Sequence, residues 1–135
     1  MIIFSAPIEA ADESSTWAAG LKNLTPEEGL TLLKLTRDFF PHDELADARY
    51  TRCIDPYDTA AADGKAKQEI DEALDMVSGA TRRMGYKTYP GISDDYERVR
   101  LSKMLADGRW MRKFKKAVEQ CLYAQPEVKA KLKRD

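Results

Sequence analysis

The chain has 135 residues, of which 43% are hydrophobic and 33% charged, and its formal net charge at pH 7 is −1. This length and composition are typical of a single soluble domain that buries a core without metals or a disulfide scaffold. No apolar run approaches the roughly 18 residues of a membrane-spanning helix, so we expect no membrane span. The start of the chain has neither the basic and apolar regions of a secretory signal nor a twin-arginine leader. We therefore expect a cytoplasmic protein, and a periplasmic one only if a partner carries it or a leader was removed.

Metal-ligating and redox-active residues are few. The chain has one histidine and two cysteines, Cys53 and Cys121, which lie far apart. Zinc sites need four ligands, commonly in closely spaced pairs, so we expect no metal site. A single disulfide is possible, but the composition is not that of a secreted, disulfide-stapled scaffold, and the state of the two cysteines stays open.

Charge is distributed unevenly along the chain. Residues 1–75 hold sixteen acidic and seven basic side chains, whereas residues 94–135 hold seven acidic and twelve basic ones. A basic segment can bind nucleic acid. Here, however, lysines alternate with apolar residues, as on the solvated face of a helix, and the acidic half would repel phosphates. We expect no nucleic-acid partner.

The organisation predicted from these patterns is all-α. No segment alternates apolar and polar residues with the β-branched enrichment of a strand. We expect an extended N-terminal arm at residues 1–23 and a compact domain of five to six helices at residues 24–135. The arm contains an isolated Trp17, so it either folds back over the domain or lies on another protein.

The clearest helix start is TPEE at residues 25–28. Thr25 suits the N-cap, proline suits the first helical position, and Glu28 completes a capping box. The helix is predicted to continue to about Phe40, because Pro41 disfavours the helical conformation of the residue before it.

Further helices are predicted downstream by apolar residues at helical spacing. They run from Asp47, placed as a cap, to about Ile54 before Pro56; from about Lys65 to Met84 before Gly85; from a Ser93 cap to Leu105; from Arg109 to Ala124; and from Pro126 onward. The expected buried positions are Ile70, Leu74, Val77, Thr81 and Met84, then Tyr96, Val99, Leu101, Met104 and Leu105, then Trp110, Phe114, Val118, Cys121 and Leu122, and finally Val128 and Leu132.

Pro41-His42-Asp43 is the stretch that most resembles a reactive site. A histidine beside an aspartate can be an oriented base. Adjacent residues at a helix exit rarely point at one another, however, and no nucleophile can be identified nearby. We favour a structural or interface role for His42 and predict no catalytic, cofactor-binding or metal-binding residue in this chain.

Two stretches resemble a known family. The first, from Leu32 to Tyr50, includes FFPHDELADARY, and the second, from Trp110 to Val128, ends in LYAQPEV. They are similar in order and spacing to two signatures of the gluconate 2-dehydrogenase subunit 3 type. These are the small, or gamma, subunits of bacterial FAD-dependent sugar and alcohol dehydrogenases.

The resemblance implies a non-catalytic small subunit that stabilises and chaperones a large subunit. That partner would bind FAD, belong to the glucose-methanol-choline (GMC) oxidoreductase type, and oxidise a sugar, a glycoside or another alcohol. Family members often carry a twin-arginine leader and a Gly-Tyr-Glu-Gly tail, which we do not find here, and we expect the apolar start to replace the tail. The expected partner contacts are Ile2, Ile3, Phe4, Phe40, Pro41, His42, Tyr86 and Tyr89.

Two alternatives remain beside this reading. One is a free-standing helical adaptor or regulator that binds some other protein. The other is an independent enzyme that uses His42 and Asp43.

Phe39, unlike Phe40, is expected to lie in the core.

Overall fold

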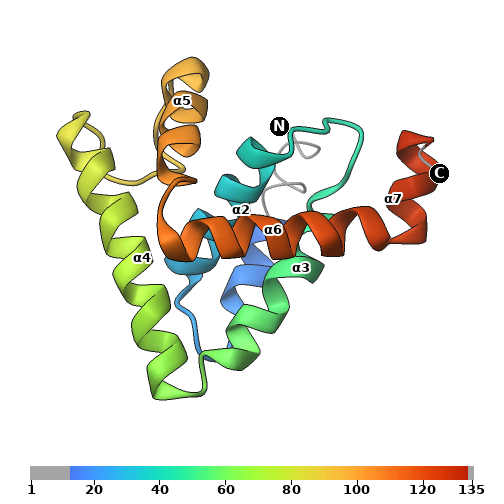
Figure 1. Ribbon diagram of the computed structural model, residues 1–135, viewed down its shortest axis with the longest axis horizontal. Coiled ribbons are helices and arrows are strands. Elements are labelled where there is room, and N and C mark those ends of the chain that lie inside the picture. Colours follow the sequence, from blue (N-terminus) through green and yellow to red (C-terminus); the bar gives the residue numbers. More distant parts are fainter. Residues whose placement is uncertain (1–12, 134–135) are drawn as a thin grey trace, which may run out of the picture.

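The computed structural model describes residues 13–133, which form seven helices and no strand (Figure 1). The all-α prediction is confirmed, whereas five to six helices is too few, because residues 13–19 of the expected extended arm are also helical. The other six helices are α2 (Pro26–Phe39), α3 (Asp47–Ala60), α4 (Gly64–Arg83), α5 (Asp95–Leu105), α6 (Arg109–Ala124) and α7 (Pro126–Leu132). Within this part of the chain, none of the helices has both the length and the apolar character that crossing a bilayer requires.

Helix starts follow the capping chemistry that the sequence predicts, with one correction. The Thr25 hydroxyl accepts from the Glu28 amide at 3.1 Å, and the Glu28 carboxylate accepts from the Thr25 amide at 2.9 Å. This reciprocal pair confirms the capping box of α2. The cap of α5 is Asp94 rather than Ser93, because the Asp94 carboxylate accepts from the Glu97 amide at 3.0 Å.

Helix α3 is longer than predicted because it continues through Pro56. A proline inside a helix removes one hydrogen bond and is expected to break it. Here Pro56 and Arg52 are both exposed, so the turn in which the bond is lost faces solvent. The residues just after it are held by tertiary contacts: Tyr57 packs against Phe114 with ring centroids 4.9 Å apart. These contacts keep the final turn helical despite the proline.

The described part of the arm folds back onto α3. The Trp17 indole donates to Asp55 at 2.8 Å. Further along, the Asp58 carboxylate accepts from the backbone amides of Lys22, Asn23 and Leu24 at 3.0, 2.8 and 2.9 Å. Burial alone would raise the pKa of Asp58. The bonds from the three amides together lower this pKa by more than burial raises it, so the net shift is downward.

The core lies where α6 crosses α2 and α3 (Figure 1). Its fully buried side chains come from these helices and from their neighbours α4 and α7; they include Leu32, Leu35, Tyr50, Ile54, Ile70, Val77, Phe114, Val118, Leu122 and Val128. Three residues predicted to be buried are exposed instead: Tyr96 retains 76%, Met104 66% and Met84 37% of their accessible surface. The buried face of α5 is formed by Arg98, Leu101 and Ser102.

A buried ion pair joins α2 to α5. The Arg98 guanidinium donates to both oxygens of Asp38, at 2.9 and 3.2 Å, and the Tyr89 hydroxyl donates to the same carboxylate at 2.6 Å. Burial, followed by the bond to Asp38 and its charge, raises the pKa of Tyr89 far above its ordinary value. The pair therefore has the hydrogen-bonded environment that a buried charge requires.

Candidate functional site

The Pro-His-Asp stretch forms the corner between α2 and α3. Phe40 leaves the helical conformation with φ −133° and ψ 76°, as the following Pro41 requires. The chain then turns through two backbone bonds of 3.0 Å, from the His42 amide to the Phe40 carbonyl and from the Leu45 amide to the His42 carbonyl. The first residue of α3, Asp47, is not its cap: Ala46 occupies that position without a side-chain bond.

Tyr50 of α3 stabilises the corner through its hydroxyl group. Its fully buried hydroxyl donates to the Phe40 carbonyl, and the His42 amide approaches that hydroxyl at 3.4 Å. The Arg37 guanidinium lies 4.5 Å from the centre of the tyrosine ring, an arrangement typical of a cation–π contact. Burial raises the pKa of Tyr50, and the charge of Arg37 opposes this only in part. Tyr50 therefore stays a neutral donor that fixes the exit of α2.

His42 binds the far end of α6. Its Nε2 lies 2.6 Å from the hydroxyl oxygen of Tyr123, and the two rings meet edge to face with centroids 5.7 Å apart. Phe40 packs on the same tyrosine ring at 5.9 Å. Among residues 13–133 no hydrogen bond joins His42 to Asp43, so the arrangement of an aspartate-oriented base is not formed there. His42 contacts its own fold and is half-buried.

The predicted partner contacts lie in different environments. Phe40 is 8% and Tyr89 2% exposed, so both side chains belong to the core and offer little surface to a partner. Tyr86 is half-buried, with its hydroxyl 3.5 Å from Glu97. Pro41 is exposed.

The remaining predictions concern the arm and the second phenylalanine. Ile2, Ile3 and Phe4 lie outside the described residues. Phe39 is half-buried rather than a core residue, and the Lys115 ammonium lies 5.4 Å from the centre of its ring. Phe40 is thus the more deeply buried of the two, because it turns inward where α2 ends, and Phe39 packs against the edge of the core.

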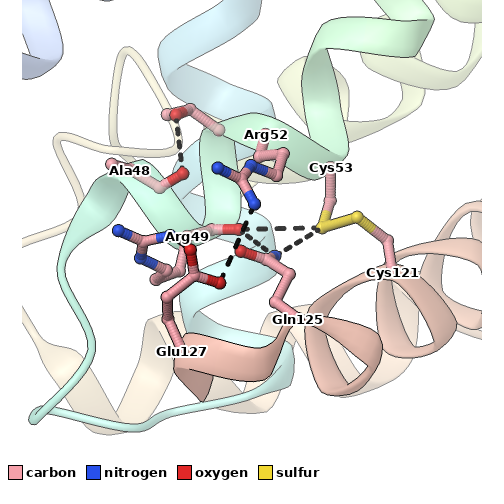
Figure 2. The surroundings of a disulfide bond; sticks show 8 residues. Ala48, Arg49, Arg52, Cys53, Cys121, Gln125 and Glu127 are labelled. Atoms are coloured by element: carbon pink, nitrogen blue, oxygen red, sulfur yellow. Dashed lines mark hydrogen bonds and ion pairs between the residues drawn. A yellow bond between two sulfur atoms is a disulfide. The ribbon is translucent and has the colours of Figure 1, made fainter. Parts of the chain in front are cut away.

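A disulfide, left open by the sequence, joins α3 to α6 (Figure 2). The Cα atoms of Cys53 and Cys121 are 5.7 Å apart, and 68 positions separate the two residues in the sequence. Buried Gln125 donates to the Arg49 carbonyl at 2.9 Å and approaches the Cys53 sulfur at 3.5 Å. Glu127 at the start of α7 pairs with Arg49 at 3.4 Å. The end of α6 is therefore fixed against α3 by a covalent bond, a buried amide and an ion pair.

The exposed part of the corner is small and acidic. Pro41, Asp43 and Glu44 face solvent, on a corner whose backbone is bonded by Tyr50 and whose His42 side chain is bonded by Tyr123. Such a rigid edge can be recognised by another protein, since ordering it costs little on binding. No group of three or more His, Cys, Asp or Glu within residues 13–133 is placed to hold a metal ion.

Several structural residues were missed from the sequence. No sequence pattern marks Asp38 and Arg98 as a buried pair, because charged residues are rarely buried and 60 positions separate the two. Gln125 gave no signal beyond its place before Pro126.

Searches against family models, curated proteins and solved structures found no significant match to this chain.

Proposed function

We propose that this chain is a non-catalytic small subunit of a hetero-oligomeric FAD-dependent oxidoreductase of the GMC type. Its partner would be the large, FAD-binding subunit, which oxidises a sugar, a glycoside or another alcohol. The small subunit would hold that partner in a folded, soluble state and contribute no group to the reaction.

One observation carries the proposal: the two stretches that resemble the family are in contact. The first contains His42 and Arg49, and the second contains Tyr123 and Gln125. His42 bonds to Tyr123 at 2.6 Å, and Gln125 bonds to the Arg49 carbonyl at 2.9 Å. Residues about 80 positions apart thus build one structural unit. That is expected if both stretches belong to the fold of one family rather than being two chance similarities.

The arrangement also supports a role in recognition rather than chemistry. Within the corner, the side chains of Tyr50 and His42 are engaged by their own fold. What the corner presents outward is Pro41, Asp43 and Glu44, in a geometry that is fixed before any partner arrives. Pre-ordered surfaces of this kind bind with a smaller entropic cost than mobile ones.

The disulfide favours the second of the two compartments considered from the sequence. Disulfides persist in oxidising compartments such as the bacterial periplasm and are rare in the cytosol. We therefore propose that the Cys53–Cys121 bond forms in an oxidising compartment, where the complex would act.

Co-expression tests the proposal directly. The proposal predicts a GMC-type flavoprotein gene beside the gene of this chain; that flavoprotein is expressed together with the chain and, separately, alone. We expect soluble, FAD-loaded large subunit only when the chain is present. Equal solubility and activity without the chain would contradict the proposal.

A charge-reversed corner sharpens this experiment. Replacing Asp43 and Glu44 by lysine should weaken co-purification of the large subunit while the chain still folds, because both side chains are exposed. The matched control replaces Asp107 and Glu119, two exposed acidic residues elsewhere, by lysine. A free-standing adaptor would instead behave as a monomer that retains no flavoprotein in either form.

A further inference from the structure

A groove lies between α4 and the start of α6, away from the corner. Its volume is about 730 Å³, and α3 and the end of α5 complete its walls. Figure 1 shows α4 standing beside the first turns of α6, with α5 above them. The residues that line the groove include neither cysteine of the disulfide nor any residue of the corner.

The floor of the groove is aromatic and fixed. Trp110 stacks on Phe114 with ring centroids 5.0 Å apart and an interplanar angle of 13°. Tyr57 meets both rings edge to face, at 5.7 and 4.9 Å. Because these rings already hold one another, the floor needs no rearrangement to accept an apolar occupant.

Two methionines border the groove and remain open. Met76 on α4 and Met104 at the end of α5 each keep 66% of their accessible surface. Such exposure is unusual for large apolar side chains that lie together along one hollow. Methionine is flexible and polarisable, so it adapts to the shape of an apolar partner.

The two rims of the groove carry opposite charges. Glu69 and Glu72 lie on the α4 side, and Arg109 and Lys113 lie on the α6 side. All four are exposed, and none takes part in a salt bridge with another residue of the described chain. An occupant that pairs with both rims must carry basic groups along one flank and acidic groups along the other. A rod with two different flanks pairs correctly in only one of its two directions.

We infer that this groove binds an amphipathic helix of a partner protein, with an apolar stripe between a basic and an acidic flank. A helix is convex and fills a hollow with side chains at i, i+3, i+4 and i+7, as grooves of this kind require. The inference rests on the proposed function to the extent that the helix would belong to the large subunit.

The test uses designed peptides of about 18 residues, long enough to form a helix on binding. The matching peptide has a leucine stripe with lysines on one flank and glutamates on the other. Two controls keep the stripe and carry only lysines or only glutamates. Binding to the full chain is followed by tryptophan fluorescence, since Trp110 lies in the floor, and by calorimetry. We expect the matching peptide to bind at least about tenfold more tightly than either control.

Variants of the chain locate the binding. Replacing Met76 and Met104 by glutamate should weaken the matching peptide at least about tenfold without unfolding the protein, because both side chains are exposed. The matched control is Tyr96→Glu, an exposed apolar residue outside the groove. Replacing Glu69 and Glu72 by lysine makes both rims basic. This variant should lose the preference for the matching peptide and should bind the all-glutamate peptide more tightly than the wild type does.

Several results would overturn the inference. They are equal binding of the three peptides, unchanged binding to the Met76→Glu, Met104→Glu variant, or a dimer of the chain that this variant dissociates, since a second copy would then be the occupant. Tighter binding of a peptide with the sequence of residues 1–12 would assign the groove to the arm.

If the flavoprotein co-purifies equally with the wild type and with the Met76→Glu, Met104→Glu variant, the groove inference fails while the proposed function stands. If the matching peptide binds as expected but no flavoprotein co-purifies, the proposed function fails while the groove still binds an amphipathic helix.

Discussion

The imidazole of His42 and the phenol of Tyr123 share a hydrogen bond of 2.6 Å across 81 positions of sequence. The bond joins the corner after α2 to the last turn of α6. It gives the only histidine of the chain a defined role in holding two distant segments together. It also means that changes at Tyr123 test the corner without altering the corner itself.

Removing the Tyr123 hydroxyl should destabilise the domain modestly. Tyr123→Phe keeps the ring contacts with His42 and Phe40 but leaves the imidazole nitrogen without this partner, and we expect a loss of about 1 kcal/mol in the free energy of unfolding. The measurement is urea denaturation. Tyr86→Phe is the matched control, since its hydroxyl makes only a 3.5 Å contact at the surface, and it should change stability little. A double-mutant cycle with His42→Phe should give a coupling energy of about 1 kcal/mol, and a value near zero would contradict the bond.

Reduction of the disulfide should cost more. Closing a loop of this length restricts the unfolded chain, which corresponds to about 4 kcal/mol in the chain-entropy description. We expect the unfolding midpoint of the wild type in urea to fall when dithiothreitol is added. The midpoint of a variant with both Cys53→Ser and Cys121→Ser should not change when dithiothreitol is added. Mass spectrometry of the protein denatured under alkylating conditions checks the bond: no thiol should react before reduction. Reaction of both thiols without reductant, in protein isolated from an oxidising compartment, would refute it.

The buried pair of Asp38 and Arg98 should be sensitive to loss of either partner. Arg98→Met leaves the Asp38 carboxylate buried without its cation, which costs about 3–5 kcal/mol. The control Arg100→Met removes an exposed arginine from the same helix and should have little effect. The variant with both Asp38→Leu and Arg98→Met should be more stable than Arg98→Met alone, because no uncompensated charge remains. Additive losses in the double variant would contradict this explanation.

Acid should release residues 22–24 from α3. The pKa of Asp58 is lowered, so its carboxylate contributes stability at pH above the ordinary value of 3.8, and that contribution is lost as the pH falls through the lower pKa of the folded state. Asp58→Asn lacks the charge at every pH. We therefore expect the wild type to be more stable than this variant at neutral pH, and the difference to shrink below about pH 4. Unfolding monitored by circular dichroism across this range measures it; a difference that is constant with pH would contradict the assignment.

Much of the helical fold could be predicted because local signals and tertiary packing agree. The capping box at Thr25 and Glu28 forms as predicted. Gly85, expected after the long helix, adopts φ 96°, a left-handed conformation that glycine accepts without strain. In these places the short-range chemistry of the chain determines the result.

Other features could not be predicted because long-range contacts decide them. Helix α3 continues past Pro56 since Tyr57 and Asp58 are held by α6 and by residues 22–24. The two cysteines meet only after α3 and α6 have packed. For the candidate site, the sequence identified Pro41 and His42, but not Tyr123 as the partner of His42, because no local pattern links residues that far apart.

The most direct test of the proposed function is purification of the complex through a tag on this chain, after co-expression with the GMC-type flavoprotein predicted to lie beside its gene. We predict that a second, larger protein is retained in a fixed molar ratio and that the complex shows the absorbance of bound flavin and oxidises an alcohol or sugar. Recovery of the chain alone, with the flavoprotein soluble, FAD-loaded and fully active in the unbound fraction, would contradict it.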